Sequence, residues 1–167
     1  MNPHASIRAL TVEEEIHRLL HEKRLTIAAV ESATGGLISH RITNVSGISA
    51  YFLGSVTSYS NEAKIQIVGV KAASIEKHGA VSAQVARQMA AGGRKLFAAD
   101  ICIADTGIAG PTGDTPTKPV GLFYIGLSTK DDTRTQKHIF KGTRLENKQQ
   151  AAQAALDWVR DYLLSVK

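Results

Sequence analysis

A short apolar run, a glycine-rich turn and an amphipathic stretch follow one another in the first quarter of the chain. The run over residues 25–30 contains β-branched side chains and is typical of a buried strand, whereas residues 37–42 carry apolar side chains at helical spacing. The two glycines between them, Gly35 and Gly36, predict a tight turn. This order predicts a strand that leads into a helix, with the hydroxyl of Ser32 and several backbone N–H groups at the start of that helix.

Two interpretations of this turn stay open from its residues alone. The start of a helix attracts anions and developing negative charge, so Ser32 could act there as a nucleophile. The simpler alternative is an ordinary turn in which Ser32 or Thr34 only caps the helix, because serine, threonine and glycine serve such turns widely.

The rest of the chain alternates between strand-like and helix-like segments and then adds a hairpin. We expect strands at residues 25–30, 54–60, 101–104, 120–127 and 133–140, and helices that begin near residues 11, 37, 61, 74, 82 and 145. This pattern predicts a single domain over residues 1–167, with residues 1–10 as a flexible segment. The fold class is α/β, a three-layer α/β/α sandwich with a mixed, mostly parallel sheet.

Two helix starts carry recognisable signals. Thr11 and Glu14 have the spacing of a capping box at the start of the first helix. Asn61 is the predicted N-cap of a short helix, which would place Lys64 in its first turn. A cation is disfavoured there by the helix dipole, and local conflicts of this kind are often functional.

Composition excludes several classes of function. The net charge of +5 comes from scattered residues, and aromatic residues are few. Nucleic-acid binding requires a basic stripe or stacking aromatics, so we do not expect it. No apolar run has the length of a membrane span, and residues 1–6 lack the core of a signal peptide, which makes cytoplasmic residence the default. Cys102 lies in an apolar run and is expected to be a buried, inert thiol.

Metal binding is not expected either. His17 and His21 have a spacing that could place both on one helix face, but no third ligand is evident. We therefore interpret them as solvated side chains and predict neither a metal site nor a cofactor.

Three segments with unusual polar or glycine content leave the predicted strands, at residues 31–36, 59–64 and 106–114. Ligands of such sheets bind beyond the carboxyl ends of the strands, so these segments are expected to converge. Ser32 and Lys64 could then form a nucleophile and its base, since a desolvated lysine can accept a proton. Spacing alone supports this pair only weakly.

Five motifs in order raise the weight of that hypothesis. They are Glu31-Ser32-Ala33-Thr34-Gly35-Gly36, residues 57–64 (TSYSNEAK), residues 79–82 (GAVS), residues 106–111 (TGIAGP) and residues 118–121 (KPVG). With these motifs in this order, the chain resembles the CinA C-terminal domain family from about residue 11 to residue 164. Stand-alone members of that family act as nicotinamide mononucleotide amidohydrolases in pyridine nucleotide salvage.

The resemblance implies an activity and a set of site residues. The expected reaction converts nicotinamide mononucleotide and water to nicotinic acid mononucleotide and ammonia, with no cofactor, in a homodimer. Ser32 matches the nucleophile and Lys64 its base. Tyr59 matches a tyrosine near the pair and is the third expected catalytic residue, since it could relay a proton or position the pair. Arg144 matches an arginine that could hold a phosphate or carboxylate. The backbone N–H groups of residues 33–36 are the candidates for an oxyanion site. The expected substrate-binding residues are Glu31, Ala33, Thr34, Gly35, Gly36, Thr106, Gly107, Ile108, Ala109, Gly110 and Arg144.

Several positions depart from the family pattern and keep an alternative open. The family usually has cysteine at Ala33 and an apolar residue at Asp105, and Thr112, Asp114 and Thr143 also differ. A carboxylate at Asp105 could point toward Lys64 and raise its pKa, or it could face away or hydrogen-bond a loop. The alternative function is a nucleotide-sensing or partner-binding module that keeps the pocket with little catalysis.

Overall fold

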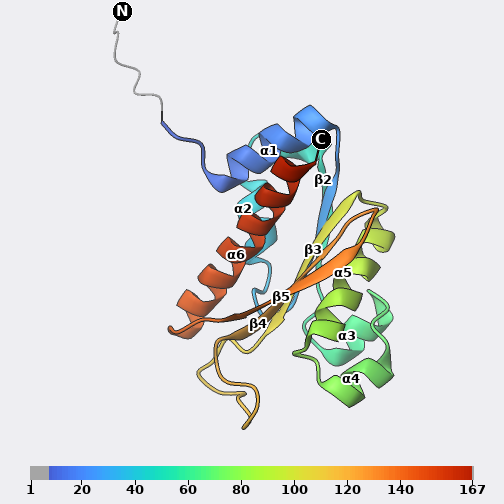
Figure 1. The fold of residues 1–167 in the computed structure, drawn as a ribbon, viewed down its shortest axis with the longest axis vertical. Helices are drawn as coiled ribbons and strands as arrows, with labels where there is room; N and C mark the ends of the chain where they lie inside the picture. Colours follow the sequence, from blue (N-terminus) through green and yellow to red (C-terminus); the bar gives the residue numbers. More distant parts are fainter. Residues whose placement is uncertain (1–7, 167) are drawn as a thin grey trace, which may run out of the picture.

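The computed structural model describes residues 8–166, which form a five-stranded sheet with helices on both faces (Figure 1). The predicted flexible segment over residues 1–10 lies mostly outside the described part, and its described residues 8–10 are exposed and belong to no helix or strand. The strands are β1 (Ile27–Glu31), β2 (Phe52–Thr57), β3 (Ile101–Gly107), β4 (Leu122–Ser128) and β5 (Thr133–Ile139). The helices are α1 (Val12–Lys23), α2 (Leu37–Thr43), the 3-10 turn η1 (Ile48–Ala50), α3 (Asn61–Gln66), α4 (Ala72–His78), α5 (Ala83–Phe97) and α6 (Arg144–Ser165).

The sheet has the order β2-β1-β3-β4-β5. It is mixed, as the sequence predicts. Strands β2, β1 and β3 pair in parallel, and β4 pairs antiparallel with both β3 and β5. Four of the five strands therefore run in the same direction, and β4 alone opposes them. The carboxyl ends of β1, β2 and β3 meet at one edge, which is where the three polar segments leave the sheet.

Two hydrophobic cores separate the sheet from its helix layers, which confirms the three-layer prediction. Successive residues of β1 point to opposite faces, so Ala29 packs with the α1 and α6 side while Ala28 and Val30 pack with the α5 side. Every residue of β1 is buried because both faces are covered. The edge strands β2 and β5 instead alternate between partly buried and exposed residues.

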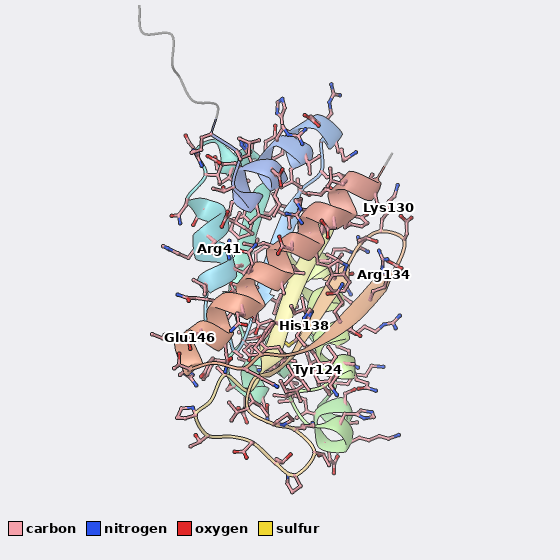
Figure 2. The ribbon with its side chains drawn as sticks, turned by 60° about the vertical axis from the view of Figure 1, so that its left-hand side comes forward. Arg41, Tyr124, Lys130, Arg134, His138 and Glu146 are labelled. Atoms are coloured by element: carbon pink, nitrogen blue, oxygen red, sulfur yellow. The ribbon has the colours of Figure 1, made fainter. Side chains whose placement is uncertain are left out.

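Helix α6 lies across one face of the sheet and connects to both of its neighbouring helices. Figure 2 shows α6 between Arg41 of α2 on one side and Arg134 and His138 of the edge strand β5 on the other. Arg41 donates to Glu13 of α1 at 2.6 Å and to Gln153 of α6 at 2.7 Å. These bonds hold α1, α2 and α6 together as one layer, and this layer positions the start of α6 beside the cavity described below.

The helix caps confirm one prediction and correct another. Thr11 and Glu14 form the predicted capping box of α1. The cap of α3 is Ser60 rather than Asn61, because the Ser60 hydroxyl accepts from the Ala63 N–H at 3.0 Å. Lys64 therefore lies in the last turn of this short helix and not in its first. The N-terminal dipole consequently does not disfavour an ammonium at Lys64, contrary to the expectation from the sequence.

Two further expectations concern single features of the described chain. Cys102 is buried as predicted, and burial raises the pKa of its thiol to about 12, which keeps it protonated and unreactive. Within residues 8–166, no helix combines the length and the apolar character that crossing a membrane would need.

Candidate active site

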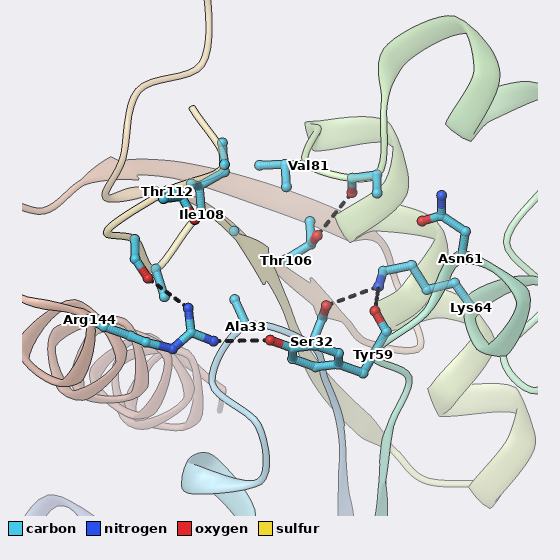
Figure 3. A pocket seen from close by; sticks show the side chains of 15 residues that line it. Ser32, Ala33, Tyr59, Asn61, Lys64, Val81, Thr106, Ile108, Thr112 and Arg144 are labelled. Carbon is cyan, nitrogen blue, oxygen red and sulfur yellow. Dashed lines mark hydrogen bonds between the residues drawn. The ribbon is translucent and has the colours of Figure 1, made fainter. Parts of the chain in front are cut away.

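A cavity of about 300 Å³ opens at the carboxyl ends of β1 and β3, where the three predicted segments converge (Figure 3). Its walls also include the segment before α5 and the first residue of α6. The lining residues are Ser32, Ala33, Tyr59, Asn61, Lys64, Ala80, Val81, Thr106, Gly107, Ile108, Ala109, Gly110, Thr112, Gly113 and Arg144.

Ser32 and Lys64 meet at the bottom of this cavity, although 32 positions separate them in the chain. The Nζ of Lys64 lies 2.9 Å from the Oγ of Ser32, and the two side chains point toward each other (Figure 3). Nζ also donates to the carbonyl oxygens of Ser58 at 2.8 Å and of Tyr59 at 3.2 Å. Lys64 is only 2% exposed, while Ser32 keeps 7% and reaches the cavity. The geometry therefore pairs a hydroxyl that a ligand can reach with an amine shielded from water.

The surroundings of Lys64 favour its neutral form. Burial lowers the pKa of Lys64 because the ammonium loses its hydration, and the charge of Asp105 acts against this shift. A neutral amine has two N–H groups and one lone pair. The two carbonyl oxygens can accept the two N–H groups, which leaves the lone pair for the proton of the Ser32 hydroxyl. The three contacts of Nζ are thus compatible with a base.

Glu31 shapes the turn that carries Ser32. Its carboxylate is fully buried and accepts from the Thr34 hydroxyl at 2.6 Å and from the N–H groups of Gly36, Ile38 and Ser39 at 2.8–3.0 Å. The Ser39 hydroxyl also contacts it. These bonds occupy the free N–H groups at the start of α2, in place of a capping hydroxyl.

The structure does not bring four of the predicted substrate-binding residues into the cavity. Glu31 and Thr34 are fully buried beneath the turn and bond to protein groups. Gly35 and Gly36 have φ values of +66° and +98°, which only glycine adopts easily, and they lie on the far side of the turn beside Lys148. Their position follows from the turn itself, because one side of it faces α6 and the other faces the cavity.

Fewer backbone N–H groups are available for the predicted oxyanion site than the four of residues 33–36. The Thr34 N–H donates to Asp105, the Gly35 N–H to the Ser32 carbonyl and the Gly36 N–H to Glu31. Within the described residues, the Ala33 N–H has no acceptor, and Ala33 lines the cavity. Ala33 is therefore the member of this set that can still donate to a developing oxyanion.

Asp105 hydrogen-bonds the loop that carries Ser32, which was one of the alternatives left open by the sequence. It is fully buried and accepts from the N–H groups of Ser32 and Thr34, both at 3.1 Å, and it also contacts the Thr34 hydroxyl. Burial raises the pKa of Asp105 to about 6, the bonds from Thr34 oppose this and the charge of Glu31 adds to it. Its side chain makes no hydrogen bond to Lys64 among the described contacts.

The side chains of Arg144 and Tyr59 lie at the rim of the cavity and not at its base. Arg144 donates to the carbonyl of Gly110 at 2.7 Å and to the Tyr59 hydroxyl at 3.0 Å (Figure 3). Tyr59 is 61% exposed, and its hydroxyl bonds Arg144 instead of Ser32 or Lys64. Only the backbone carbonyl of Tyr59 touches the pair, so the role that fits its side chain is one of binding at the rim.

The segment from Thr106 to Gly110, which was expected to bind the substrate, lines the opposite wall of the cavity. The Thr106 hydroxyl donates to the carbonyl of Ala80 at 2.9 Å, and this bond joins the end of β3 to the segment before α5. A Cβ on Gly107 would come within 2.4 Å of the Phe123 ring, so no larger residue fits. This wall is built from backbone held close to its neighbours.

Several residues of the site were not predicted from the sequence. Asn61 and Val81 line the cavity beside Lys64 and Thr106. Asn147 is buried on α6 and donates to the carbonyls of Ala109 and Gly142, both at 3.0 Å, which fixes the glycine-rich loop. An asparagine at an otherwise apolar position of the last helix was the available signal.

Within residues 8–166, no three His, Cys, Asp or Glu side chains gather closely enough to hold a metal ion. His21 instead lies 2.6 Å from the Tyr51 hydroxyl through Nδ1, and His17 packs against the same ring.

Comparison with known proteins identifies relatives of this chain. The chain is 46% identical over 156 residues to a CinA-like protein from Sulfurihydrogenibium sp., a match that covers 93% of this chain and 39% of that protein. It is 47% identical to a putative competence-damage inducible protein from Thermoanaerobacter sp., again over 93% of this chain and 38% of the relative. The chain thus spans about two fifths of the length of these relatives.

Solved structures of related proteins superpose on this chain over almost their full length. The competence damage-inducible protein A (ComA) from Klebsiella pneumoniae superposes with a TM-score of 0.90 at 28% identity, covering 93% of this chain and 97% of that one. The competence/damage inducible protein CihA from Agrobacterium tumefaciens gives 0.86 at 31% identity, with 96% and 99% covered. The model of the CinA C-terminal domain matches residues 9–163. Because this match extends over almost the whole chain, the protein belongs to the CinA C-terminal domain family.

Proposed function

We propose that this protein hydrolyses the carboxamide of nicotinamide mononucleotide to nicotinic acid mononucleotide and ammonia. The single observation that carries the proposal is the 2.9 Å contact between the Ser32 hydroxyl and the buried amine of Lys64 at the base of an open cavity. A serine beside a desolvated lysine is a known form of activated nucleophile.

The first half of the reaction forms an ester on Ser32. The neutral amine of Lys64 takes the hydroxyl proton while Oγ attacks the carboxamide carbon, and the negative charge that develops on the carbonyl oxygen faces the Ala33 N–H. The resulting ammonium of Lys64 returns its proton to the amide nitrogen as the C–N bond breaks. Ammonia leaves, and the acyl group remains on Oγ.

The second half repeats these steps with water. Lys64 takes a proton from a water molecule, which attacks the ester carbon, and the proton then returns to Oγ as the ester bond breaks. The products are the free carboxylic acid and the original Ser32 hydroxyl. One water is consumed and one ammonia released, so the atoms balance without any cofactor.

The nucleotide part of the substrate is supported by the rim of the cavity. Arg144 lies there with its guanidinium held by Gly110 and Tyr59, so its charge is positioned before a ligand binds. A fixed guanidinium suits a phosphate group. The substrate itself is proposed from the resemblance of the five motifs to nicotinamide mononucleotide amidohydrolases.

Incubation of the purified chain with nicotinamide mononucleotide tests the proposal. We expect equal amounts of ammonia and nicotinic acid mononucleotide, measured by a coupled ammonia assay and by chromatography. Binding of the nucleotide by calorimetry, without release of ammonia over the pH range in which the protein stays folded, would refute the enzyme and support a nucleotide-sensing module.

A further inference from the structure

A single hydroxyl lies between two fully buried carboxyl groups directly beneath the nucleophile. The Thr34 Oγ1 is 2.6 Å from Oε2 of Glu31 and also contacts Oδ1 of Asp105. A hydroxyl carries one proton and can donate to only one of two acceptors. For both contacts to be hydrogen bonds, a second proton is needed between Oγ1 and one of the carboxyl groups, and one of the two carboxyl groups must supply it.

The remaining contacts decide which carboxyl group holds that proton. Glu31 accepts from three backbone N–H groups and the Ser39 hydroxyl at the start of α2, and these donors stabilise its ionised form. Asp105 accepts from two backbone N–H groups only. The arrangement that satisfies every atom has Thr34 donating to Glu31 and Asp105 donating to Thr34.

We propose that Asp105 is a positioning residue that holds a proton, donates it to the Thr34 hydroxyl and fixes the Ser32 turn without a negative charge beside Lys64. In its acid form, Asp105 still accepts from the N–H groups of Ser32 and Thr34 through its two oxygens. The buried carboxyl then orients the nucleophile while the lysine keeps its neutral form. This catalytic consequence rests on the proposed amide hydrolysis, whereas the position of the proton does not.

The charged groups around Asp105 are compatible with the assignment. Glu31 faces it from β1, Lys64 lies on α3 without a hydrogen bond to it, and the amine of Lys148 on α6 lies against Gly35 at the outer side of the turn. Helix α5 packs on the opposite face of β3, against Cys102 and Ala104. The partner of Asp105 on β4 is the apolar Ile125.

The direction of the pKa shift agrees with this geometry. Burial raises the pKa of Asp105 to about 6 and the charge of Glu31 contributes, even if Thr34 donates to Asp105. If the Thr34 hydroxyl donates to Glu31 instead, its oxygen can accept a proton from Asp105. The contact between Thr34 and Asp105 then stabilises the protonated form of Asp105 and raises its pKa further. Burial lowers the pKa of Lys64 at the same time, so both shifts favour a proton on Asp105 over one on Lys64.

Carbon NMR of the wild-type protein, labelled with ¹³C at the aspartate carboxyl carbons, tests the position of the proton. With Asp105 assigned through its backbone connections, we expect its resonance at the acid limit at pH 7 and a change to the carboxylate limit only at higher pH. A carboxylate resonance at pH 7 would overturn the proposal. The measurement needs no substrate, so it stands whether or not the protein releases ammonia.

The pH dependence of kcat/KM in Asp105→Asn tests the effect on Lys64. Asparagine offers one oxygen for two N–H groups, so we expect the rate to fall by about 10- to 100-fold through a misplaced Ser32. The rising limb should stay at the wild-type pH, since a neutral side chain replaces a neutral side chain. A rising limb displaced to lower pH would mean that a negative charge was removed, and would overturn the proposal.

Asp100→Asn is the matched control, because Asp100 also accepts from a backbone N–H and a threonine hydroxyl, those of Thr26, at the other end of β3. We expect its rate and pH profile to equal those of the wild type, which would attribute the Asp105 effect to the Ser32 turn. Equal losses in both variants would assign Asp105 a general structural role and overturn the proposal.

Discussion

Replacing Lys64 by methionine removes the proposed base while keeping an unbranched side chain of similar size. Lys64 is 2% exposed and its Nζ touches one hydroxyl and two carbonyl oxygens, so the substitution removes the amine that contacts the Ser32 hydroxyl. Loss of a general base costs about 10²- to 10⁴-fold in rate, and each factor of ten corresponds to about 1.4 kcal/mol of activation free energy. We therefore expect kcat/KM to fall by at least about 10²-fold, or roughly 3 kcal/mol.

The same substitution has a smaller effect on stability. The carbonyl groups of Ser58 and Tyr59 lose a donor, and a buried unpaired group costs about 1–3 kcal/mol. Removal of a buried amine offsets part of this cost. We expect the free energy of unfolding to fall by on the order of 2 kcal/mol, measured by chemical denaturation, so the variant should remain folded during the assay.

The pH profile separates a base from a structural lysine. Burial lowers the pKa of Lys64, and the amine is a base only above that pKa, so the wild-type rate should rise with pH through it. Lys64→Arg should be as inactive as Lys64→Met at every pH, because a guanidinium does not deprotonate in proteins. Lys77→Met on the exposed face of α4 is the control and should match the wild type. Substantial activity in Lys64→Arg with the wild-type pH profile would refute Lys64 as the base.

Three further predictions test the rim and the buried acid. Arg144→Ala should weaken kcat/KM more for the mononucleotide than for the corresponding riboside, and equal losses for both would point to a structural role in holding Gly110 and Tyr59. Tyr59→Phe should keep most of the activity in the ammonia assay, because the lost hydroxyl bonds Arg144 and not the pair; a loss as large as that of Lys64→Met would contradict this. Since the pKa of Asp105 is raised from 3.8 to about 6, and further when Thr34 donates to Glu31, the folded state binds its proton more tightly, so stability relative to Asp105→Asn should decrease by about 3 kcal/mol or more in total as the pH rises from about 3 to above the folded-state pKa. Denaturation curves with no difference over that range would contradict the raised pKa.

The helices, the strands and the mixed sheet were predictable because they depend on local patterns of apolar residues and glycine turns. Spacing along the chain indicated the pair of Ser32 and Lys64 only weakly, and the expectation of this pair came mainly from the resemblance to the family. The choice between Ser60 and Asn61 as a cap was not predictable, since both residue types cap helices well and adjacent positions differ only in backbone angles.

The buried carboxyl groups show where prediction from the sequence ends. Glu31 lies in a motif that suggests ligand binding, yet its oxygens all face N–H and hydroxyl groups of its own chain. Asp105 differs from the family pattern and could have pointed either way. Its function depends on the 3.1 Å distances to the N–H groups of Ser32 and Thr34, which join segments more than 70 residues apart. Such contacts depend on packing, which spacing along the chain does not specify.

The rate of ammonia release by Ser32→Ala, compared with Ser58→Ala, tests the central claim most directly. Ser58 is buried next to the same lysine, its hydroxyl has no partner among the described atoms, and alanine keeps the carbonyl that Lys64 uses. We predict that Ser58→Ala releases ammonia from nicotinamide mononucleotide at the wild-type rate while Ser32→Ala loses at least about 10³-fold, as expected for removal of a nucleophile. Near wild-type release by a folded Ser32→Ala would contradict the assignment of Ser32 as the nucleophile.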